Sequence, residues 1–218
     1  MKKYILLIFI SLFFLTGCTN IYDLTLDSIV NKVLEEDTLK RNTYLEGYKF
    51  YLPEDMTLIG DYKSNNILYS YGDKYYLYVD LISFYNNKQN KYNINHSAYE
   101  YSKEISYNDL EGYVAISKSN GGHLVEVMYN YAKIEVVTKD TKRAVANSLV
   151  VLKNIKYNYK IIDSMIGSNA LVYDAELFEL MGPSEDTDNF LSYEEEFGVY
   201  DEKENSTDED VIDMDVVD

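Results

Sequence analysis

The chain has 218 residues, and its 37 Asp and Glu residues outnumber its 20 Lys and Arg residues to give a formal net charge of −17. It contains one Cys, two His, no Trp and 24 Tyr. One thiol excludes a framework of internal disulfides, and so few Cys and His residues exclude a structural zinc site built from them. The charge argues against a nucleic-acid binder with a basic surface, and the length suits one domain with appendages.

The charge is distributed unevenly along the chain. Residues 163–218 contain 19 acidic residues and a single basic one, Lys203, whereas residues 18–162 contain 17 basic and 18 acidic residues. A block of like charges repels itself and tends to remain extended. We therefore expect a nearly neutral folded domain followed by an acidic, largely disordered C-terminal tail over residues 163–218.

The N-terminus has the pattern of an export signal. Lys2 and Lys3 form a short positive region, and residues 4–15 (YILLIFISLFFL) form an apolar run of 12 residues. A membrane-spanning helix needs about 20 residues, so this run is too short to span a membrane comfortably and is typical of a signal-peptide core.

The four residues Leu15, Thr16, Gly17 and Cys18 follow the apolar run and resemble the bacterial lipobox. That resemblance implies cleavage after Gly17 and attachment of a diacylglycerol to Cys18. Two or three acyl chains anchor a protein stably, because each buried CH₂ contributes about 0.8 kcal/mol. The resemblance thus predicts a lipoprotein on the extracytoplasmic face of a bacterial cell membrane. The alternative is an uncleaved anchor with an incidental Cys.

Two amphipathic helices are predicted in the body of the chain. From Leu26 to about residue 37 the apolar residues fall at helical spacing, with Thr25 as the N-cap. Asp140 is the predicted N-cap of a second helix, which runs to about Lys153 with a broad apolar face. Residues 18–25 form a short tether before the first helix.

Most of the remaining residues up to 162 have the pattern of strands. Residues 75–84 (YYLYVDLISF) are apolar on both alternating faces, which predicts a central strand covered on both sides. The tripeptide Asn120-Gly121-Gly122 predicts a hairpin turn. Loop is predicted for 86–95 and a short helix for 97–105. The other expected strands are 48–52, 56–59, 66–71, 112–117, 123–129, 133–138 and 155–162.

The predicted organisation is a signal peptide over 1–17, the tether over 18–25, an α+β domain over 26–162 and the tail over 163–218. Within the domain, the alternation of helices and hairpins favours an antiparallel β-sheet with helices packed on it. Three stretches, 47–53, 112–137 and 144–157, resemble the Mog1/PsbP-like domain. That family includes photosystem II assembly proteins and bacterial lipoproteins. The resemblance implies a binding scaffold without common catalytic residues.

The sequence contains few candidates for catalysis. His96 and His123 are most simply surface histidines, and no G-x-S-x-G nucleophile elbow is present. Asp80 lies within an apolar stretch, where a carboxylate needs a partner or a shifted pKa. An extracytoplasmic enzyme that acts on cell-envelope material, with Asp80 or His123 as acid–base groups, is therefore one hypothesis.

No metal site or cofactor is predicted. The acidic residues from Asp186 onward have Phe190, Leu191 and Phe197 where an EF-hand loop needs Asp or Asn, Gly and Glu. The tyrosines in the strand region allow two interpretations, ligand or partner contact and ordinary packing of half-buried strands. These tyrosines are Tyr69, Tyr71, Tyr75, Tyr76, Tyr78 and Tyr85.

The tail combines acidic residues with spaced apolar ones, a pattern typical of segments that fold in a partner's groove. The candidate partner contacts are Leu177, Phe178, Phe190, Leu191, Tyr193 and Phe197. The alternative is a solvated, self-repelling tail. The favoured function is a membrane-anchored binding or assembly module without catalysis. The envelope enzyme is one alternative, and a structural lipoprotein whose tail provides spacing is another.

Overall fold

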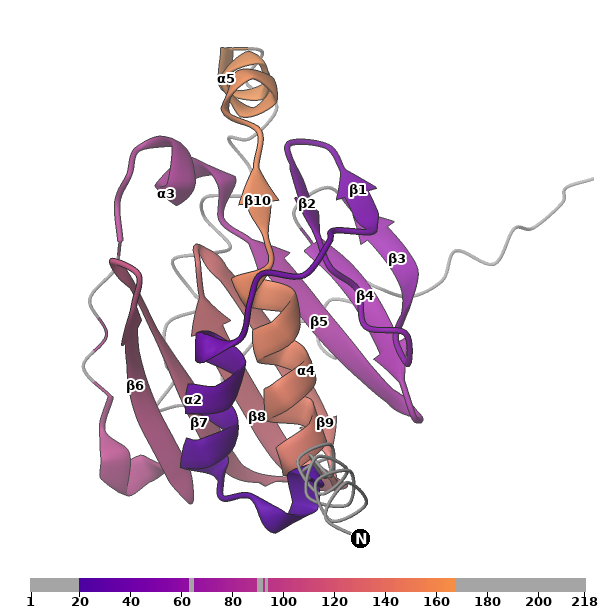
Figure 1. Ribbon diagram of the computed structural model, residues 1–218, viewed down its shortest axis with the longest axis vertical. Coiled ribbons are helices and arrows are strands. Elements are labelled where there is room, and N and C mark those ends of the chain that lie inside the picture. Colours follow the sequence, from indigo (N-terminus) through magenta and orange to yellow (C-terminus); the bar gives the residue numbers. More distant parts are fainter. Residues whose placement is uncertain (1–19, 63–64, 90–91, 93, 168–218) are drawn as a thin grey trace, which may run out of the picture.

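The computed structural model describes residues 20–62, 65–89, 92 and 94–167 (Figure 1). The predicted signal peptide, Cys18 and the tail from residue 168 lie outside the described residues. The same holds for all six candidate partner contacts, Leu177, Phe178, Phe190, Leu191, Tyr193 and Phe197. The structure therefore concerns the predicted α+β domain and the segment directly before it.

A seven-stranded antiparallel sheet is the centre of the fold, with strand order β3-β4-β5-β9-β8-β7-β6. A small antiparallel sheet, β1-β2-β10, lies beside it. The strands are β1 Thr43–Leu45, β2 Tyr48–Phe50, β3 Thr57–Tyr62, β4 Asn65–Ser70, β5 Asp73–Val79, β6 Tyr101–Tyr107, β7 Leu110–Ser119, β8 Gly122–Tyr129, β9 Ala132–Thr138 and β10 Lys156–Tyr157. The predicted α+β class with an antiparallel sheet and packed helices is confirmed.

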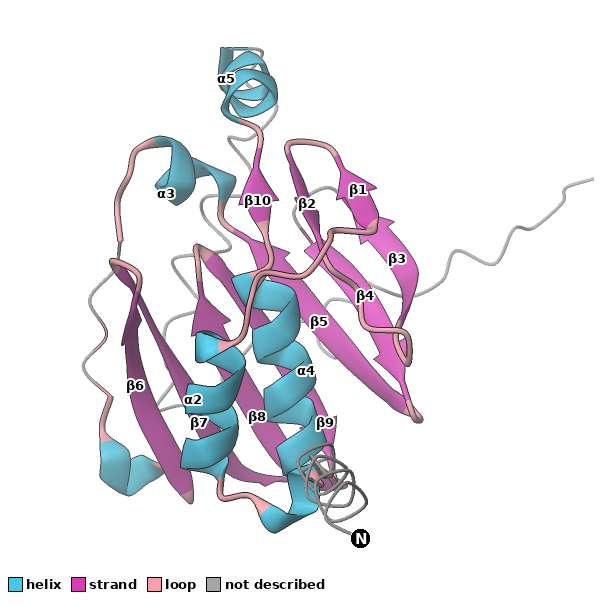
Figure 2. Cartoon of the chain, in the orientation of Figure 1, coloured by secondary structure: helices cyan, strands magenta, loops and turns pink. Residues whose placement is uncertain are grey.

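Two helices, α2 (Leu26–Glu35) and α4 (Thr141–Lys153), pack side by side on one face of the large sheet (Figure 2). Their N-caps are the predicted ones, because Thr25 accepts a hydrogen bond from the Ser28 amide and Asp140 accepts one from the Arg143 amide. Both helices bury their apolar stripes against the sheet, and this layer forms the main hydrophobic core.

The strand predicted over 75–84 is correct only in its first half. It ends at Val79, and the short helix α3 (Leu81–Tyr85) follows. Asp80 causes the change of direction, because its side chain accepts a hydrogen bond from the Ser83 amide and caps α3. The prediction of a central strand covered on both faces is confirmed for β5, which lies between β4 and β9 and is buried on both sides.

Two further sequence predictions are wrong. Residues 97–105 do not form a helix; they contain a single 3-10 turn, η2 (His96–Ala98), and most of β6, which pairs with β7 and buries Ile105 in the core. Residues 155–162 form only the two-residue β10 before the helix α5 (Tyr159–Gly167) begins. The buried residues of α5, Ile162 and Met165, are three apart, which is helical spacing.

Candidate functional site

The face of the large sheet opposite α2 and α4 carries two rows of directly paired residues. Cross-strand partners lie on the same face of a sheet, so each row is a line of neighbouring side chains. One row runs Tyr113, Met128, Lys133, Tyr78 and Asn65. The next row runs Ala115, Glu126, Glu135, Tyr76 and Ile67. All ten residues are buried, and we call these two rows the second face.

Three charged residues meet in the middle of the second face. The Lys133 ammonium nitrogen lies 2.9 Å from Oε1 of Glu126 and 2.6 Å from Oε1 of Glu135. All three side chains are at most 3% exposed. With every group ionised the triad carries one net negative charge in a nearly water-free environment, where unpaired charge is costly.

A two-residue hairpin turn places the three charges together. Asn130 and Tyr131 both have positive φ values, 55° and 58°, between β8 and β9, as the tight turns that match strand twist require. This turn fixes the register, so that Glu126 lies opposite Glu135 and Met128 opposite Lys133. This triad was not among the sequence predictions. A two-residue turn at Asn130 and Tyr131 would have implied the register that brings its three residues together.

Burial and the attraction between opposite charges act in opposite directions on each pKa in the triad. Burial raises the pKa of the Glu126 carboxyl above its usual value, because the charge of Lys133 offsets only part of the cost of desolvation. Burial acts to lower the pKa of Lys133, but the negative charges of Glu135 and Glu126 outweigh it and raise that pKa well above the usual value. Lys133 is therefore held as a cation and not as a neutral nucleophile.

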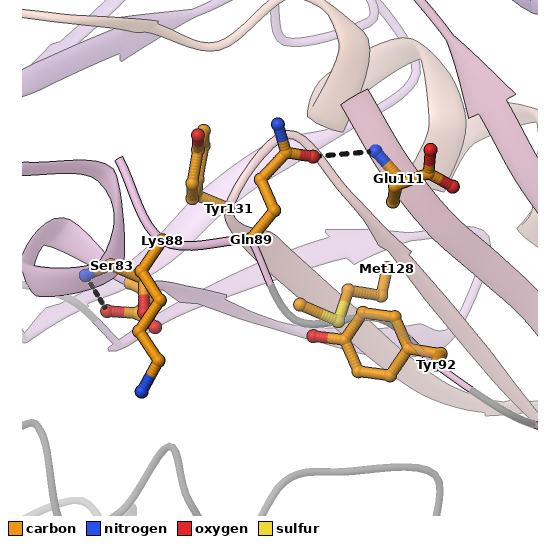
Figure 3. A pocket seen from close by; sticks show the side chains of 8 residues that line it. Ser83, Lys88, Gln89, Tyr92, Glu111, Met128 and Tyr131 are labelled. Atoms are coloured by element: carbon orange, nitrogen blue, oxygen red, sulfur yellow. Dashed lines mark hydrogen bonds between the residues drawn. The ribbon is translucent and has the colours of Figure 1, made fainter. Parts of the chain in front are cut away.

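A small hollow lies at the edge of the second face, beside Asp80 (Figure 3). Met128, Tyr92 and Tyr131 line it together with Lys88 and other polar residues. Its volume is about 10 Å³, roughly the space that one water molecule needs.

Local hydrogen bonds organise the polar rim of that hollow. Gln89 accepts a hydrogen bond from the Glu111 amide at 2.9 Å and donates one to the Asp109 carbonyl at 2.8 Å. Asp80 accepts the Ser83 amide at 2.8 Å. Burial raises the pKa of the Asp80 carboxyl, although the hydrogen bonds from Ser83 act in the opposite direction. Each of these side chains thus already fastens a loop to a neighbouring element.

The two acid–base candidates from the sequence, Asp80 and His123, do not lie together. The Asp80 amide donates to the carbonyl of Tyr131, just before the first residue of β9, whereas His123 pairs with Thr138, the last residue of that strand. They are therefore separated by the length of β9. Nε2 of His123 lies 3.1 Å from a carboxylate oxygen of Glu100. His96 forms a 2.7 Å hydrogen bond with the Ser102 hydroxyl.

The tyrosines of the strand region do not form one surface. Tyr75, Tyr76 and Tyr78 are buried within the sheet layers, as the packing interpretation expects. Tyr69 and Tyr71 are 43% and 71% exposed. Tyr85 stacks on Tyr159 of α5 with the ring centroids 5.1 Å apart.

A larger groove, of about 140 Å³, lies between α2 and the edge strand β6. Apolar and polar residues line it, among them Leu34, Ile105 and Ser106. Lys103 crosses between the two elements, since it lies 3.1 Å from Asp27 and donates to Asn31. Among the described residues, no strand pairs with the outer edge of β6. An edge strand of this kind can pair with a further extended segment.

The described residues contain no cluster of three or more His, Cys, Asp or Glu side chains arranged to hold a metal ion. None of the helices in this part of the chain has the length and apolar character needed to cross a membrane. Comparison with family models, curated proteins and solved structures found no match to the chain.

Proposed function

We propose that this protein is a lipoprotein anchored to the extracytoplasmic face of a bacterial cell membrane, with a lipid on Cys18. The observation that carries this proposal is the position of the only Cys in the chain. It stands directly after Leu15, Thr16 and Gly17, just beyond an apolar run (residues 4–15) that is too short to span a bilayer.

Metabolic labelling with radioactive palmitate tests the anchor directly. The wild-type chain is expected to incorporate label, to sediment with membranes and to begin at residue 18 by mass spectrometry. The variant Cys18→Ser is expected to lose the label and to retain the signal peptide. An unlabelled wild-type chain, or a mature N-terminus other than residue 18, would contradict the proposal.

We further propose that the domain is a binding or assembly module without catalysis. Its titratable candidates are engaged in holding the fold together: Asp80 caps a helix, His123 pairs with Glu100, and Lys133 pairs with two glutamates. The groove between α2 and β6 is a feature that suits a partner, because an open edge strand can pair with an added strand.

We also propose that the domain is Mog1/PsbP-like. Three structural features support it. The strand β2 leads into Pro53 before β3, consecutive hairpins β6 to β9 fill one half of the sheet, and the helix α4 is followed at once by β10. This assignment implies a scaffold and leaves the partner to be found by experiment.

A pull-down from membranes tests the binding role and locates the binding surface. Ser106→Trp places a large side chain in the groove, and Ser119→Trp is the matched control on an exposed strand end. Loss of a partner with Ser106→Trp but not with Ser119→Trp would support the groove. Identical partner sets for wild type and both variants would exclude it.

Truncation tests the proposed contribution of the acidic tail. The cut belongs after Gly167, because Ile162 and Met165 of α5 are buried in the domain. If Leu177, Phe178 and the later apolar residues bind a partner, the truncated chain is expected to lose that partner while it stays on the membrane. If it keeps every partner, the tail is no docking segment, and a structural envelope role for the tail becomes the better hypothesis.

A further inference from the structure

The segment that follows Cys18 is fastened to one end of the domain. The 3-10 turn η1 (Ile21–Asp23) lies beside the N-terminal turn of α4 (Figure 1). The Tyr22 hydroxyl donates to Asp140 at 2.6 Å and accepts from Arg143 at 2.5 Å, and Lys142 donates to the Tyr22 carbonyl at 2.8 Å. Ile21 and Leu24 pack against the main core. Residues 20–25 are thus held against the domain.

This attachment leaves very little free chain between the proposed lipid and the domain. Only Thr19 separates Cys18 from Asn20, whose side chain caps η1 by accepting the Tyr22 amide. The Cα atoms of Cys18 and Asn20 lie at most about 7 Å apart, because an extended chain advances about 3.5 Å per residue. A domain fastened so close to its lipid cannot turn freely above the bilayer.

We propose that the end of the domain built from η1, the β4–β5 turn and the first turn of α4 lies against the lipid surface, so that the domain has a fixed orientation on the membrane. This inference rests on the proposed lipidation of Cys18. The short tether determines which end faces the bilayer, and the side chains at that end are compatible with the interface.

Tyrosines and cations occur together at this end. Tyr22 and Tyr71 are 47% and 71% exposed, and the Arg143 guanidinium lies 4.0 Å from the centre of the Tyr71 ring. Lys74 and Lys139 are exposed nearby, at the start of β5 and just before α4. Tyrosine is favoured at the level of lipid headgroups, and Lys and Arg are attracted to anionic lipids. Asp23 is also exposed here and offsets part of the positive charge. The short tether, rather than attraction between charges, therefore determines which end of the domain faces the bilayer.

Helix α5 lies at the other end of the domain. Helix α4 leads away from η1 to β10 and α5 (Figure 1). The proposed orientation therefore places α5 on the side of the domain away from the bilayer, and η1 on the side that faces it.

Site-directed fluorescence on lipidated protein in vesicles tests the orientation. Acylation occupies the only Cys, so one introduced thiol is labelled specifically. Lys139→Cys, at the proposed membrane end, is paired with Lys160→Cys on α5, and both lysines are exposed. Energy transfer to an acceptor lipid in vesicles of phosphatidylcholine and phosphatidylglycerol reports each distance. Residue 160 is expected about 20 Å farther from the surface, since the 13 residues of α4 rise about 1.5 Å each.

Each outcome of this experiment decides a separate point. Protein that fails to float with the vesicles would contradict the lipid anchor on which the inference rests. Protein that floats, but whose two labels lie equally far from the surface, would overturn the orientation alone. Tyr22→Ala is expected to reduce the difference between the two distances, whereas Tyr44→Ala, which removes an exposed tyrosine from β1, should preserve it. An unchanged difference in Tyr22→Ala would show that Tyr22 does not hold the tether.

Discussion

Lys133 and Glu135 stand two residues apart on β9, point to the same face of the sheet and form an ion pair of 2.6 Å in which both side chains are 1% exposed. Glu126 on the neighbouring strand completes the group. Replacing a buried ionic group with apolar residues often leaves stability unchanged or improves it, whereas removing one partner leaves an uncompensated charge. We therefore expect the intact triad to add little net stability and the loss of a single member to be costly.

Removal of the lysine alone is expected to be severe. Lys133→Met leaves two buried carboxylates without their cation, and such a change typically costs about 3–5 kcal/mol of unfolding free energy. The combined variant Lys133→Met, Glu126→Gln, Glu135→Leu removes the charges together and is expected to recover most of that loss. Urea denaturation followed by circular dichroism measures both variants. If the single variant is as stable as wild type, the triad is not buried as described.

The raised pKa of Glu126 predicts the direction in which the stability of the protein changes with pH. Because burial raises this pKa above the usual 4.5, the folded protein binds the proton more tightly than the unfolded chain does. The stabilising contribution of the proton is therefore complete below about pH 4.5 and is lost as pH rises through the folded pKa.

Glu126→Gln cannot ionise, so the unfolding free energy of the wild type is expected to fall relative to this variant as pH rises from 4 to 8. The exposed Glu104→Gln is the matched control and should follow the wild-type profile. Parallel stability profiles for wild type and Glu126→Gln would contradict the prediction.

Two substitutions at Asp80 separate its capping role from its charge. Asp80→Ala removes the acceptor for the Ser83 amide and is expected to cost about 0.5–2 kcal/mol, as the loss of an N-cap does. Asp80→Asn keeps a hydrogen-bond acceptor but removes a buried carboxyl group, whose pKa is raised by desolvation. It is expected to be at least as stable as wild type at neutral pH. Denaturant midpoints measure the stability of both variants. Equal losses of stability in Asp80→Ala and Asp80→Asn would argue against a capping role for Asp80.

Gly112 on β7 is required by the close approach of β8. A Cβ atom at this position would lie 2.1 Å from the carbonyl oxygen of Met128, which belongs to the backbone of the paired strand. Gly112→Ala is therefore expected to destabilise the protein by about 1–3 kcal/mol or more, as overpacking does.

A Cβ atom at Gly72 would have no neighbouring atom within 4 Å, so Gly72→Ala costs only the strain of the positive φ at this position. It is therefore the control for Gly112→Ala. Thermal unfolding ranks the two variants. A larger loss for Gly72→Ala would contradict the close approach at Gly112.

Local signals in the sequence were sufficient for several elements. Thr25 and Asp140 cap the two helices as predicted, because an N-cap depends on a side chain and an amide only a few residues apart. The Asn120-Gly121 turn and the two-faced strand β5 also follow from adjacent residues. By contrast, residues 97–105 have no decisive local pattern, and they form β6 because β7 offers them a partner.

The sequence by itself determined the uneven distribution of charge along the chain and the helix caps, and it is the source of the proposed export signal with its single Cys, because each depends on residues close together in the chain. Only the tertiary structure decided which distant residues meet. It separated Asp80 from His123 along β9, joined Lys133 to two glutamates through strand register, and fastened Tyr22 to the start of α4. These contacts depend on strand pairing and packing between residues far apart in the chain, and Tyr22 lies more than a hundred residues from Asp140. No local pattern encodes them.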